Sequence, residues 1–179
     1  MKLSQLAFLL GAVTAIPGIY GIAKPHAFRG QAVKFPRSLP MGYLLMAVAT
    51  VWFVFNLSRE SIADYAQYKP YLLGGFALLG VLSCIYVKDY LAVRGLAVVF
   101  LLLAKLMVDS ARWEPSAWRL VIPIWAYALV ISGILFAVSP WKCRDLLNWI
   151  TASDGRLRTF SGLALVLAIV VIALGALVY

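Results

Sequence analysis

The chain has 179 residues, of which 64% are hydrophobic and only 13% are charged. In soluble domains roughly a quarter of all residues are charged. A soluble chain of this length could not bury so much apolar surface away from water. The composition excludes a soluble globular domain and a disordered chain. It predicts an all-α, polytopic integral membrane protein. The net charge of +9 comes without a basic run or a nucleic-acid motif, so we predict no nucleic-acid partner.

Six apolar runs are each long enough to cross the bilayer as a helix, which needs about 20 residues. In chain order they cover residues 6–23, 41–57, 71–87, 91–108, 118–138 and 160–178. The third and fourth runs are separated only by Lys88, Asp89 and Tyr90, and together they are too long for one span. We therefore expect a tight turn there and six transmembrane helices arranged as three hairpins.

The first run has two special features. Met1-Lys2 followed by an apolar stretch up to residue 15 is also compatible with a cleavable signal peptide. Cleavage would leave the basic stretch 24–37 to be translocated, so we favour a retained span. Pro17-Gly18 interrupts this run, and proline removes the backbone donor that would bond the carbonyl of Val13. We expect a helix break or kink there, which would either shape a cavity or adjust packing.

Lysine and arginine residues are divided unequally between the two sides of the predicted membrane. The first, third and fifth connections carry ten, the opposite side carries five, and Lys105 lies inside a run, which accounts for all 16. The ten-residue side is therefore predicted to be cytoplasmic, with both termini outside. Eight of its basic residues are candidates for contact with anionic lipid headgroups: Lys24, Arg29, Lys34, Arg37, Lys142, Arg144, Arg156 and Arg158.

The fifth connection contains a predicted amphipathic helix over residues 140–151. Ser139 is a suitable cap and Pro140 suits the first helical position. At 100° per residue, one face is apolar and the opposite face is polar. The apolar face holds Cys143, Leu146, Leu147, Trp149 and Ile150. The helix should lie in the cytoplasmic interface and end near Asp154, as an anchor and spacer rather than a regulatory lipid sensor. A weaker helix of this kind is expected over residues 59–68.

The first and last pairs of spans share a sequence pattern. Pro25 and Arg29 have the same Pro-x-x-x-Arg spacing as Pro140 and Arg144. In both pairs a later arginine precedes a glycine near the start of the second span. Residues 6–57 and 118–178 are therefore a candidate parallel repeat. Many transporters use inverted repeats, so this pattern weakens a transporter interpretation without removing it.

The last part of the chain resembles a known family. It contains Val130-Ile131-Ser132-Gly133, then Ser139-Pro140 with basic residues, then Arg156-Leu157-Arg158-Thr159-Phe160-Ser161-Gly162 and an apolar tail. Over residues 129–178 this resembles a family of small uncharacterised bacterial inner-membrane proteins with two spans and a basic amphipathic linker. That family often has glutamate where this chain has Ser132. The resemblance implies a bacterial inner-membrane setting and no catalytic residues.

Polar residues on the fourth span are the main candidates for chemistry. Arg94, Lys105, Asp109 and Arg112 fall within about 60° of one another at helical spacing. Ionisable groups inside a span are costly and often functional, so the four form a candidate intramembrane polar cluster. Lys105 is only roughly 6 Å from the outer end at about 1.5 Å per residue, however. It can snorkel to the interface or pair with Asp109, which we favour over transport or proton relay.

Other side chains give no catalytic or metal-binding pattern. His26 is the only histidine and has no His or Glu at helical spacing, and Cys84 and Cys143 lack CxxC spacing. We therefore predict no metal site, no cofactor and no enzyme activity. Small residues at Gly11/Ala15 and Ala164/Ala168 predict faces that pack against other membrane subunits or a second copy.

These observations favour a non-catalytic multi-pass membrane protein that acts as an accessory or scaffold subunit of a membrane complex. Its expected partners are the lipid bilayer and other membrane subunits or itself. The alternative is a small transporter or channel that uses Lys105, Asp109 and the Pro17-Gly18 kink. A lipid-modifying enzyme comes third, because no catalytic set is visible.

Overall fold

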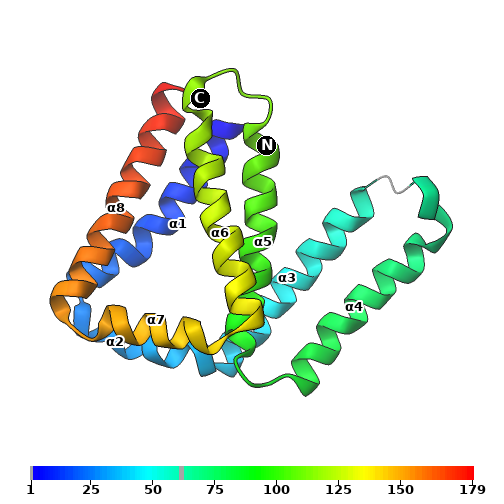
Figure 1. The fold of residues 1–179 in the computed structure, drawn as a ribbon, viewed down its shortest axis with the longest axis horizontal. Coiled ribbons are helices and arrows are strands. Elements are labelled where there is room, and N and C mark those ends of the chain that lie inside the picture. The colour runs from blue at the N-terminus through cyan, green and yellow to red at the C-terminus, as the bar shows by residue number, and fades with distance from the viewer. Residues whose placement is uncertain (1, 61–62) are drawn as a thin grey trace. The chain divides into compact units, whose positions relative to one another are not determined.

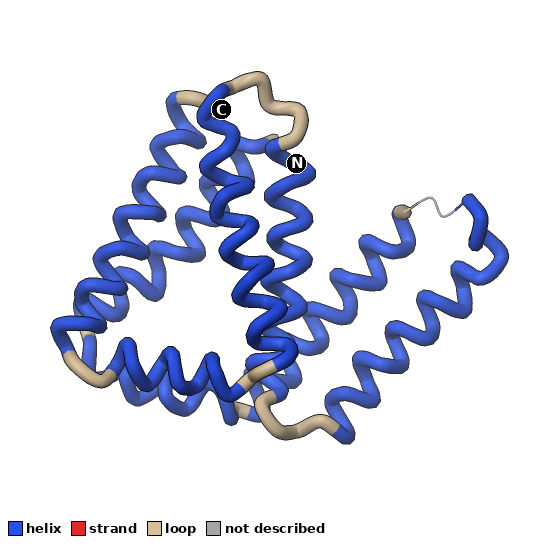
Figure 2. The backbone as a smooth tube through the Cα atoms, viewed as in Figure 1, coloured by secondary structure: helices blue, strands red, loops and turns tan. Residues whose placement is uncertain are grey.

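The computed structural model describes residues 2–60 and 63–179, and these residues are almost entirely helical (Figure 1). No strand occurs in this part of the chain, as the colours of Figure 2 show. The α-helices are α1 (Leu3–Ala23), α2 (Pro25–Lys34), α3 (Leu39–Arg59), α4 (Lys69–Tyr86), α5 (Leu91–Ala111), α6 (Val121–Val138), α7 (Trp141–Thr151) and α8 (Asp154–Leu177). Short 3-10 helices lie between them: η1 (Phe35–Arg37), η2 (Ala63–Tyr68) and η3 (Ala117–Leu120).

Six of the described helices are long and apolar enough to cross a membrane. They are α1, α3, α4, α5, α6 and α8, and each coincides with one of the predicted runs. The all-α class is therefore confirmed, and the six helices fit a multi-pass membrane protein. The last of them starts earlier than expected, since α8 begins at Asp154. Arg156 and Arg158, expected in the connection, lie in its first two turns.

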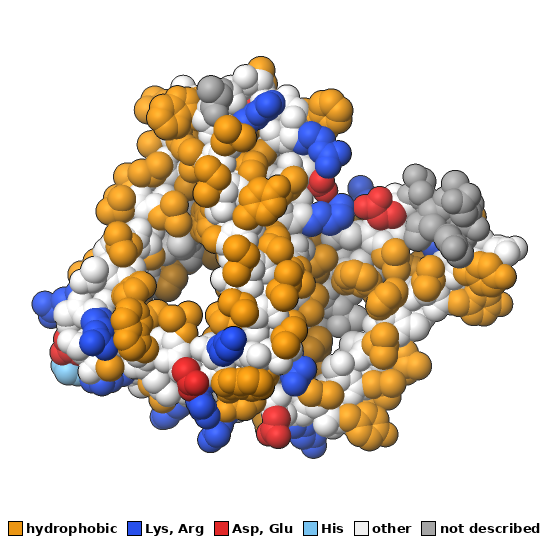
Figure 3. Space-filling view, viewed as in Figure 1, with side chains coloured by type: hydrophobic (Ala, Val, Ile, Leu, Met, Phe, Trp, Pro, Cys, Tyr) orange, Lys and Arg blue, Asp and Glu red, His pale blue; other side chains and the backbone are white. Residues whose placement is uncertain are grey.

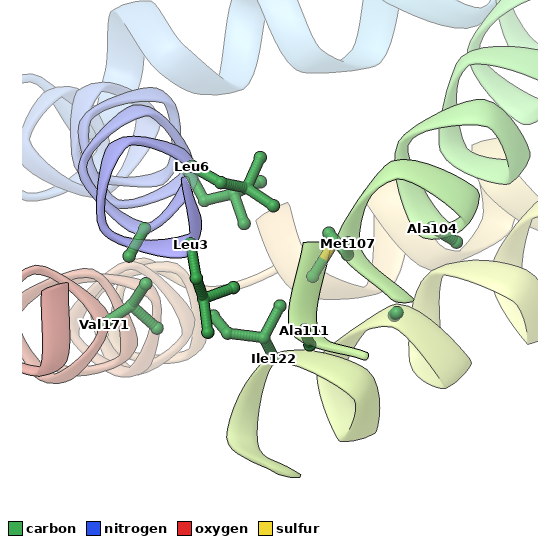
Figure 4. Packing of buried hydrophobic residues seen from close by; sticks show 10 residues of the cluster. Leu3, Leu6, Ala104, Met107, Ala111, Ile122 and Val171 are labelled. Atoms are coloured by element: carbon green, nitrogen blue, oxygen red, sulfur yellow. The ribbon is translucent and has the colours of Figure 1, made fainter. Parts of the chain in front are cut away.

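The described chain divides into two compact units. Unit 1 contains residues 2–34, 103–131 and 144–179, and unit 2 contains residues 35–102 and 132–143. Unit 1 has a core of aliphatic side chains from α1, α5, α6 and α8. In Figure 4, Leu3 and Leu6 of α1 lie near Ile122 and Met107, with Val171 of α8 on the other side of α1. Leu6, Met107 and Ile122 are fully buried.

Helices α1 and α8 of unit 1 pack through small residues. Gly11, Gly18 and Gly21 are buried at a spacing of seven and three residues, which keeps them on one side of α1. A Cβ atom on Gly11 would come within 3.0 Å of the carbonyl oxygen of Ala168, and one on Gly18 within 2.8 Å of Leu165 Cγ. The missing side chains therefore allow the two helices to approach closely and gain van der Waals contact.

This packing corrects one expectation. We predicted that Gly11 and Ala168 belong to faces that bind other subunits or a second copy, but they lie against each other within the chain. Both residues are buried. Small residues indicate a close helix contact, and the sequence does not say whether the other helix belongs to the same chain.

Unit 2 is built around a crossing of α3 with the first part of α5. A Cβ atom on Gly42 would lie 3.0 Å from the backbone nitrogen of Ala92. One on Gly95 would lie 2.9 Å from the backbone nitrogen of Met46. Each glycine therefore makes room for the backbone of the other helix. Helix α4 lies along α3, where the rings of Phe53 and Phe76 have centroids 4.8 Å apart.

Helices pack closely within each unit. In unit 1, α1 packs on α8, and side chains of α5 and α6 share the core. In unit 2, α3 packs on α4, and Gly133 of α6 meets the first part of α5. The connecting helices α2 and α7 have 10 and 11 residues. The arrangement of the six spans as three hairpins stays a prediction.

The predicted helix break at Pro17-Gly18 is absent. Helix α1 continues through both residues to Ala23. Pro17 is exposed, whereas Gly18 is buried against α8. Proline removes only one backbone hydrogen bond, and close packing on both sides of that position holds the helical geometry.

Within the described residues, the connections contain one α-helix that the sequence did not predict. The expected helix at 140–151 is confirmed as α7, although it ends at Thr151, and Asp154 begins α8 instead of closing α7. Helix α2 occupies the corresponding place between α1 and α3 and starts at Pro25. Both copies of the Pro-x-x-x-Arg pattern thus mark the start of a short helix, while the duplication itself stays a prediction. Where the weaker helix was expected, over residues 59–68, the structure forms the 3-10 helix η2 from Ala63 to Tyr68. Residues 61 and 62 lie outside the described residues.

Candidate functional site

Helix α5 carries the predicted polar cluster, and three of its four members lie together. Lys105 Nζ is 3.0 Å from Asp109 Oδ2, and Arg112 Nη2 is 4.0 Å from Asp109 Oδ1. Arg94 is near the opposite end of α5, roughly 16 Å along the helix from Lys105 at about 1.5 Å per residue. The Nε atom of Arg94 is buried and has no hydrogen-bond partner among the described residues. Asp109 is therefore shared by two cations that do not include Arg94.

The shared carboxylate predicts unequal effects of two substitutions. Asp109→Leu should cost about 1 kcal/mol, because it leaves Lys105 and Arg112 without their common acidic neighbour. Lys105→Leu should cost less than about 0.5 kcal/mol, because Arg112 remains beside Asp109. The side chains are about half exposed, so both effects are small. Melting of the purified variants in detergent measures this difference, and equal losses would contradict a shared carboxylate.

A cavity of about 420 Å³ lies beside this ion-pair group. Its lining residues are Lys2, Leu3, Leu106, Asp109, Ser110, Trp113, Glu114 and Tyr179. The Tyr179 hydroxyl donates a hydrogen bond to the carbonyl oxygen of Trp118 at 2.7 Å. Burial, together with the negative charge of Glu114, raises the pKa of Tyr179. Sequence reasoning found Asp109 but missed Tyr179, because only the folded chain brings the ends of α1, α5 and α8 together.

Two of the predicted basic connections meet at the other end of unit 1. Arg29 Nη2 donates a hydrogen bond to the carbonyl oxygen of Ala152 at 3.1 Å. His26 Nε2 lies 4.0 Å from Asp154 Oδ2. The chain after α1 and the chain before α8 therefore lie at the same end of the α1–α8 pair, as one shared membrane side requires.

The eight predicted lipid-contacting residues have different surroundings. Arg144 is paired with Asp145 at 2.7 Å. The guanidinium of Arg37 lies 5.9 Å from the ring centre of Tyr90, and that of Arg156 lies 5.1 Å from that of Trp149. All of the eight except Arg144 are exposed. Figure 3 shows lysine and arginine side chains near α2 and α7, below helices whose surface is largely hydrophobic.

The predicted apolar face of α7 is divided by the structure. Leu147 and Ile150 line a cavity of unit 1, whereas Leu146 and Trp149 stay 44% and 50% exposed. The apolar arc is therefore wider than the part that packs against unit 1. An outward apolar edge beside polar side chains is what a helix lying in a membrane interface presents to lipid.

Cys143 of α7 is predicted to react slowly with thiol reagents. It is 4% exposed, and burial raises the pKa of its thiol from 9.0 to about 11. Only the thiolate reacts, and at pH 8 a thiol with that pKa is about one-thousandth ionised. Maleimide at pH 8 should therefore modify Cys143 in the unfolded chain but hardly in the folded protein. Peptide mass spectrometry checks this, and rapid modification of the folded protein would contradict the burial.

The cavity beside α7 is the second candidate site. We define the inner cavity as the space of about 240 Å³ lined by Pro17, Gly18, Phe28, Leu147, Ile150, Thr151, Leu157, Phe160, Ser161 and Ala164. The wall comes from α1, α2, α7 and α8 and is almost wholly apolar. Pro17 and Gly18, the expected helix break, thus lie at a cavity wall although α1 is continuous. Sequence reasoning missed Phe28, because α2 was not predicted as a helix.

No group of three His, Cys, Asp or Glu side chains within residues 2–60 and 63–179 is placed to hold a metal ion. Comparison with protein-family models, with curated proteins and with solved structures gave no match. The resemblance of residues 129–178 to small inner-membrane proteins therefore stays a prediction.

Proposed function

We propose that the protein is a non-catalytic, multi-pass membrane protein that serves as an accessory or scaffold subunit of a membrane complex. The observation that supports this proposal is the exposed surface of α4, none of whose residues is buried. Residues 66–86 have a mean hydropathy of 1.4, the lowest among the six candidate spans, and none of them is buried within unit 2. The span least suited to lipid is thus one that its own unit leaves exposed, which favours cover by another membrane protein.

The glycines of α4 indicate where such a partner would lie. Gly80 faces α3, since a Cβ atom there would come within 2.9 Å of Thr50 Cβ. A Cβ atom on Gly74 or Gly75 would meet nothing within 4 Å. Glycine gives no advantage against lipid, whereas it allows a second helix backbone to approach closely. We therefore assign the face at Gly74 and Gly75 to a transmembrane helix of a partner protein.

The proposal includes an orientation in the membrane. The basic connections face the cytoplasm, and the start of α1 and the end of α8 face outward. The excess of ten basic residues over five supports this orientation. The contact between Arg29 and Ala152 supports a shared side for the first and fifth connections. The resemblance of residues 129–178 supports a bacterial inner membrane.

Transport has less support as a function. Lys105 Nζ lies 3.0 Å from Asp109 Oδ2, so the two charges neutralise each other. Gly18 lies in the contact between α1 and α8. Neither feature is then free to bind and release a substrate.

Extraction in a mild detergent tests the subunit proposal. The wild-type chain should leave the membrane in a complex larger than a monomer, and Gly74→Leu with Gly75→Leu should release it as a monomer that melts at an unchanged temperature. The matched control is Gly162→Leu, another glycine whose Cβ would meet nothing within 4 Å, and it should leave the complex intact. A wild-type protein that emerges only as a lone monomer would contradict the proposal.

A further inference from the structure

We propose that the inner cavity binds one acyl chain of an anionic phospholipid whose phosphate is held by Arg29 and Arg156. The inference goes beyond the subunit function and does not depend on it. It depends on the cavity wall and on the charged side chains that border it, all of which belong to unit 1.

The inner cavity is built like a slot for an apolar chain. Its floor is closed by buried residues, among them Leu157 at 1% and Thr151 at 2% exposure. The Thr151 hydroxyl donates to the carbonyl oxygen of Leu147 at 2.7 Å, so it does not demand a polar ligand. Pro17 and Phe160 are exposed at the mouth. The volume of about 240 Å³ is below the roughly 300 Å³ at which drug-sized sites begin, which suits part of a single chain.

Two guanidinium groups are connected to the wall of this cavity. Arg29 follows the lining residue Phe28 and donates a hydrogen bond to the carbonyl oxygen of Ala152, next to the floor residue Thr151. It keeps its other N–H donors for a ligand. From α8, Arg156 lies over the ring of Trp149.

Two aromatic contacts link Arg156 to the cavity wall. The Trp149 ring meets that of Phe160 edge-on, with centroids 5.5 Å apart, and Phe160 is a wall residue. Stacking occupies the face of the Arg156 guanidinium and leaves its N–H edge available. Guanidinium groups bind phosphate oxygens in pairs of parallel hydrogen bonds, so two of them suit one phosphodiester.

The combination of groups identifies the occupant. A free phosphate would explain the arginines but not the apolar slot, and a neutral lipid would explain the slot but not the arginines. Lys24 and Arg158 are further exposed cations near this end of α1 and α8. The acids of α7 and α8 belong to the same unit: Asp154 lies 4.0 Å from His26, and Asp145 of α7 is paired with Arg144. A phospholipid with a net negative headgroup complements both the charge and the apolar lining.

Photolabelling of the purified full-length chain tests this site. The probe is phosphatidylglycerol with a diazirine in one acyl chain, added to the protein in nanodiscs of phosphatidylcholine. Irradiation should label peptides that contain cavity-wall residues of α1, α7 and α8. Unlabelled phosphatidylglycerol should suppress this labelling, whereas added phosphatidylcholine and free inorganic phosphate should not.

Two variants separate the slot from the headgroup contacts. Ala164→Phe should fill the cavity, and Arg29→Gln with Arg156→Gln should remove the phosphate ligands; each should lower labelling about tenfold. Gly162→Leu is the matched control for the first variant. Lys88→Gln with Arg119→Gln controls for the second, because it removes two exposed charges that lie outside both the cavity wall and the eight predicted lipid contacts. If the Ala164→Phe protein melts at a lower temperature than wild type, its loss of labelling no longer reports on the cavity. The Arg29→Gln, Arg156→Gln variant then tests the proposal.

Three results would overturn the proposal. These are labels spread evenly over the outward faces of α3 and α4, equal suppression by phosphatidylcholine, and an equal loss in the Lys88/Arg119 control. The first two would indicate ordinary surrounding lipid, and the third would indicate general surface charge. A protein that labels as expected but forms no complex would contradict the subunit function alone.

Discussion

Gly11→Leu is expected to destabilise the folded protein by about 3 kcal/mol, at the upper end for overpacked sites. The added side chain would start from a Cβ position 3.0 Å from the carbonyl oxygen of Ala168. A backbone oxygen in a helix cannot turn aside as a side chain can, so α1 and α8 must separate. Thermal melting of the purified protein in detergent measures the loss.

Gly162→Leu is the matched control for this substitution. It places the same side chain on the same helix pair, where a Cβ atom would meet nothing within 4 Å, and its melting temperature should equal that of wild type. If Gly11→Leu instead melts normally and only changes the size of the extracted complex, Gly11 would belong to a partner face, as its sequence pattern first suggested.

Gly95→Leu is expected to have an effect of similar size, about 3 kcal/mol, in unit 2. Its Cβ atom would start 2.9 Å from the backbone nitrogen of Met46 and 3.0 Å from the carbonyl carbon of Leu45. Both atoms belong to the backbone of α3, so the crossing of α3 with α5 must open. Loss of the folded form during a denaturant titration in detergent measures this effect.

The control for the second substitution is Gly74→Leu on α4, in the same unit. A Cβ atom at Gly74 meets nothing within 4 Å, and the purified monomer should unfold at the wild-type denaturant concentration. A Gly95→Leu protein that is as stable as this control would mean that α3 and α5 do not cross closely at Gly42 and Gly95.

The helices could be predicted from the sequence because each depends on a local property. Apolar runs of about 20 residues have few structures open to them in lipid, and these runs became α1, α3, α4, α5, α6 and α8. Helix α7 was visible because an amphipathic pattern follows Ser139-Pro140. Helix α2 was missed, because its 10 residues have no comparable amphipathic pattern.

The helix pairs could not be predicted, because pairing depends on groups far apart in the sequence. Helices in lipid gain little from burial against each other, so close contact decides which ones pack. Gly11 meets Ala168 and Gly18 meets Leu165, and nothing near Gly11 in the sequence indicates either contact. The inner cavity was missed for the same reason, since its wall joins Pro17 and Phe28 with Thr151 and Phe160.

The polar cluster shows what helical spacing can and cannot predict. The link between Lys105 and Asp109 was predicted, because residues four apart on a helix face each other. Arg94 shares the predicted face but is too far along α5 to join them. The cavity beside Asp109 includes Tyr179, whose place there depends on the packing of α8.

Site-directed labelling of single cysteines tests whether six spans cross a membrane with the basic connections on its cytoplasmic side. In a Cys84→Ala, Cys143→Ala background, single cysteines at Gln31, Ser153, Gln67 and Pro115 report on exposed positions of the connections. A membrane-impermeant maleimide should label the last two positions in intact cells and the first two only after the membrane is opened. Labelling that places Gln31 and Ser153 on opposite sides of the membrane would contradict this topology.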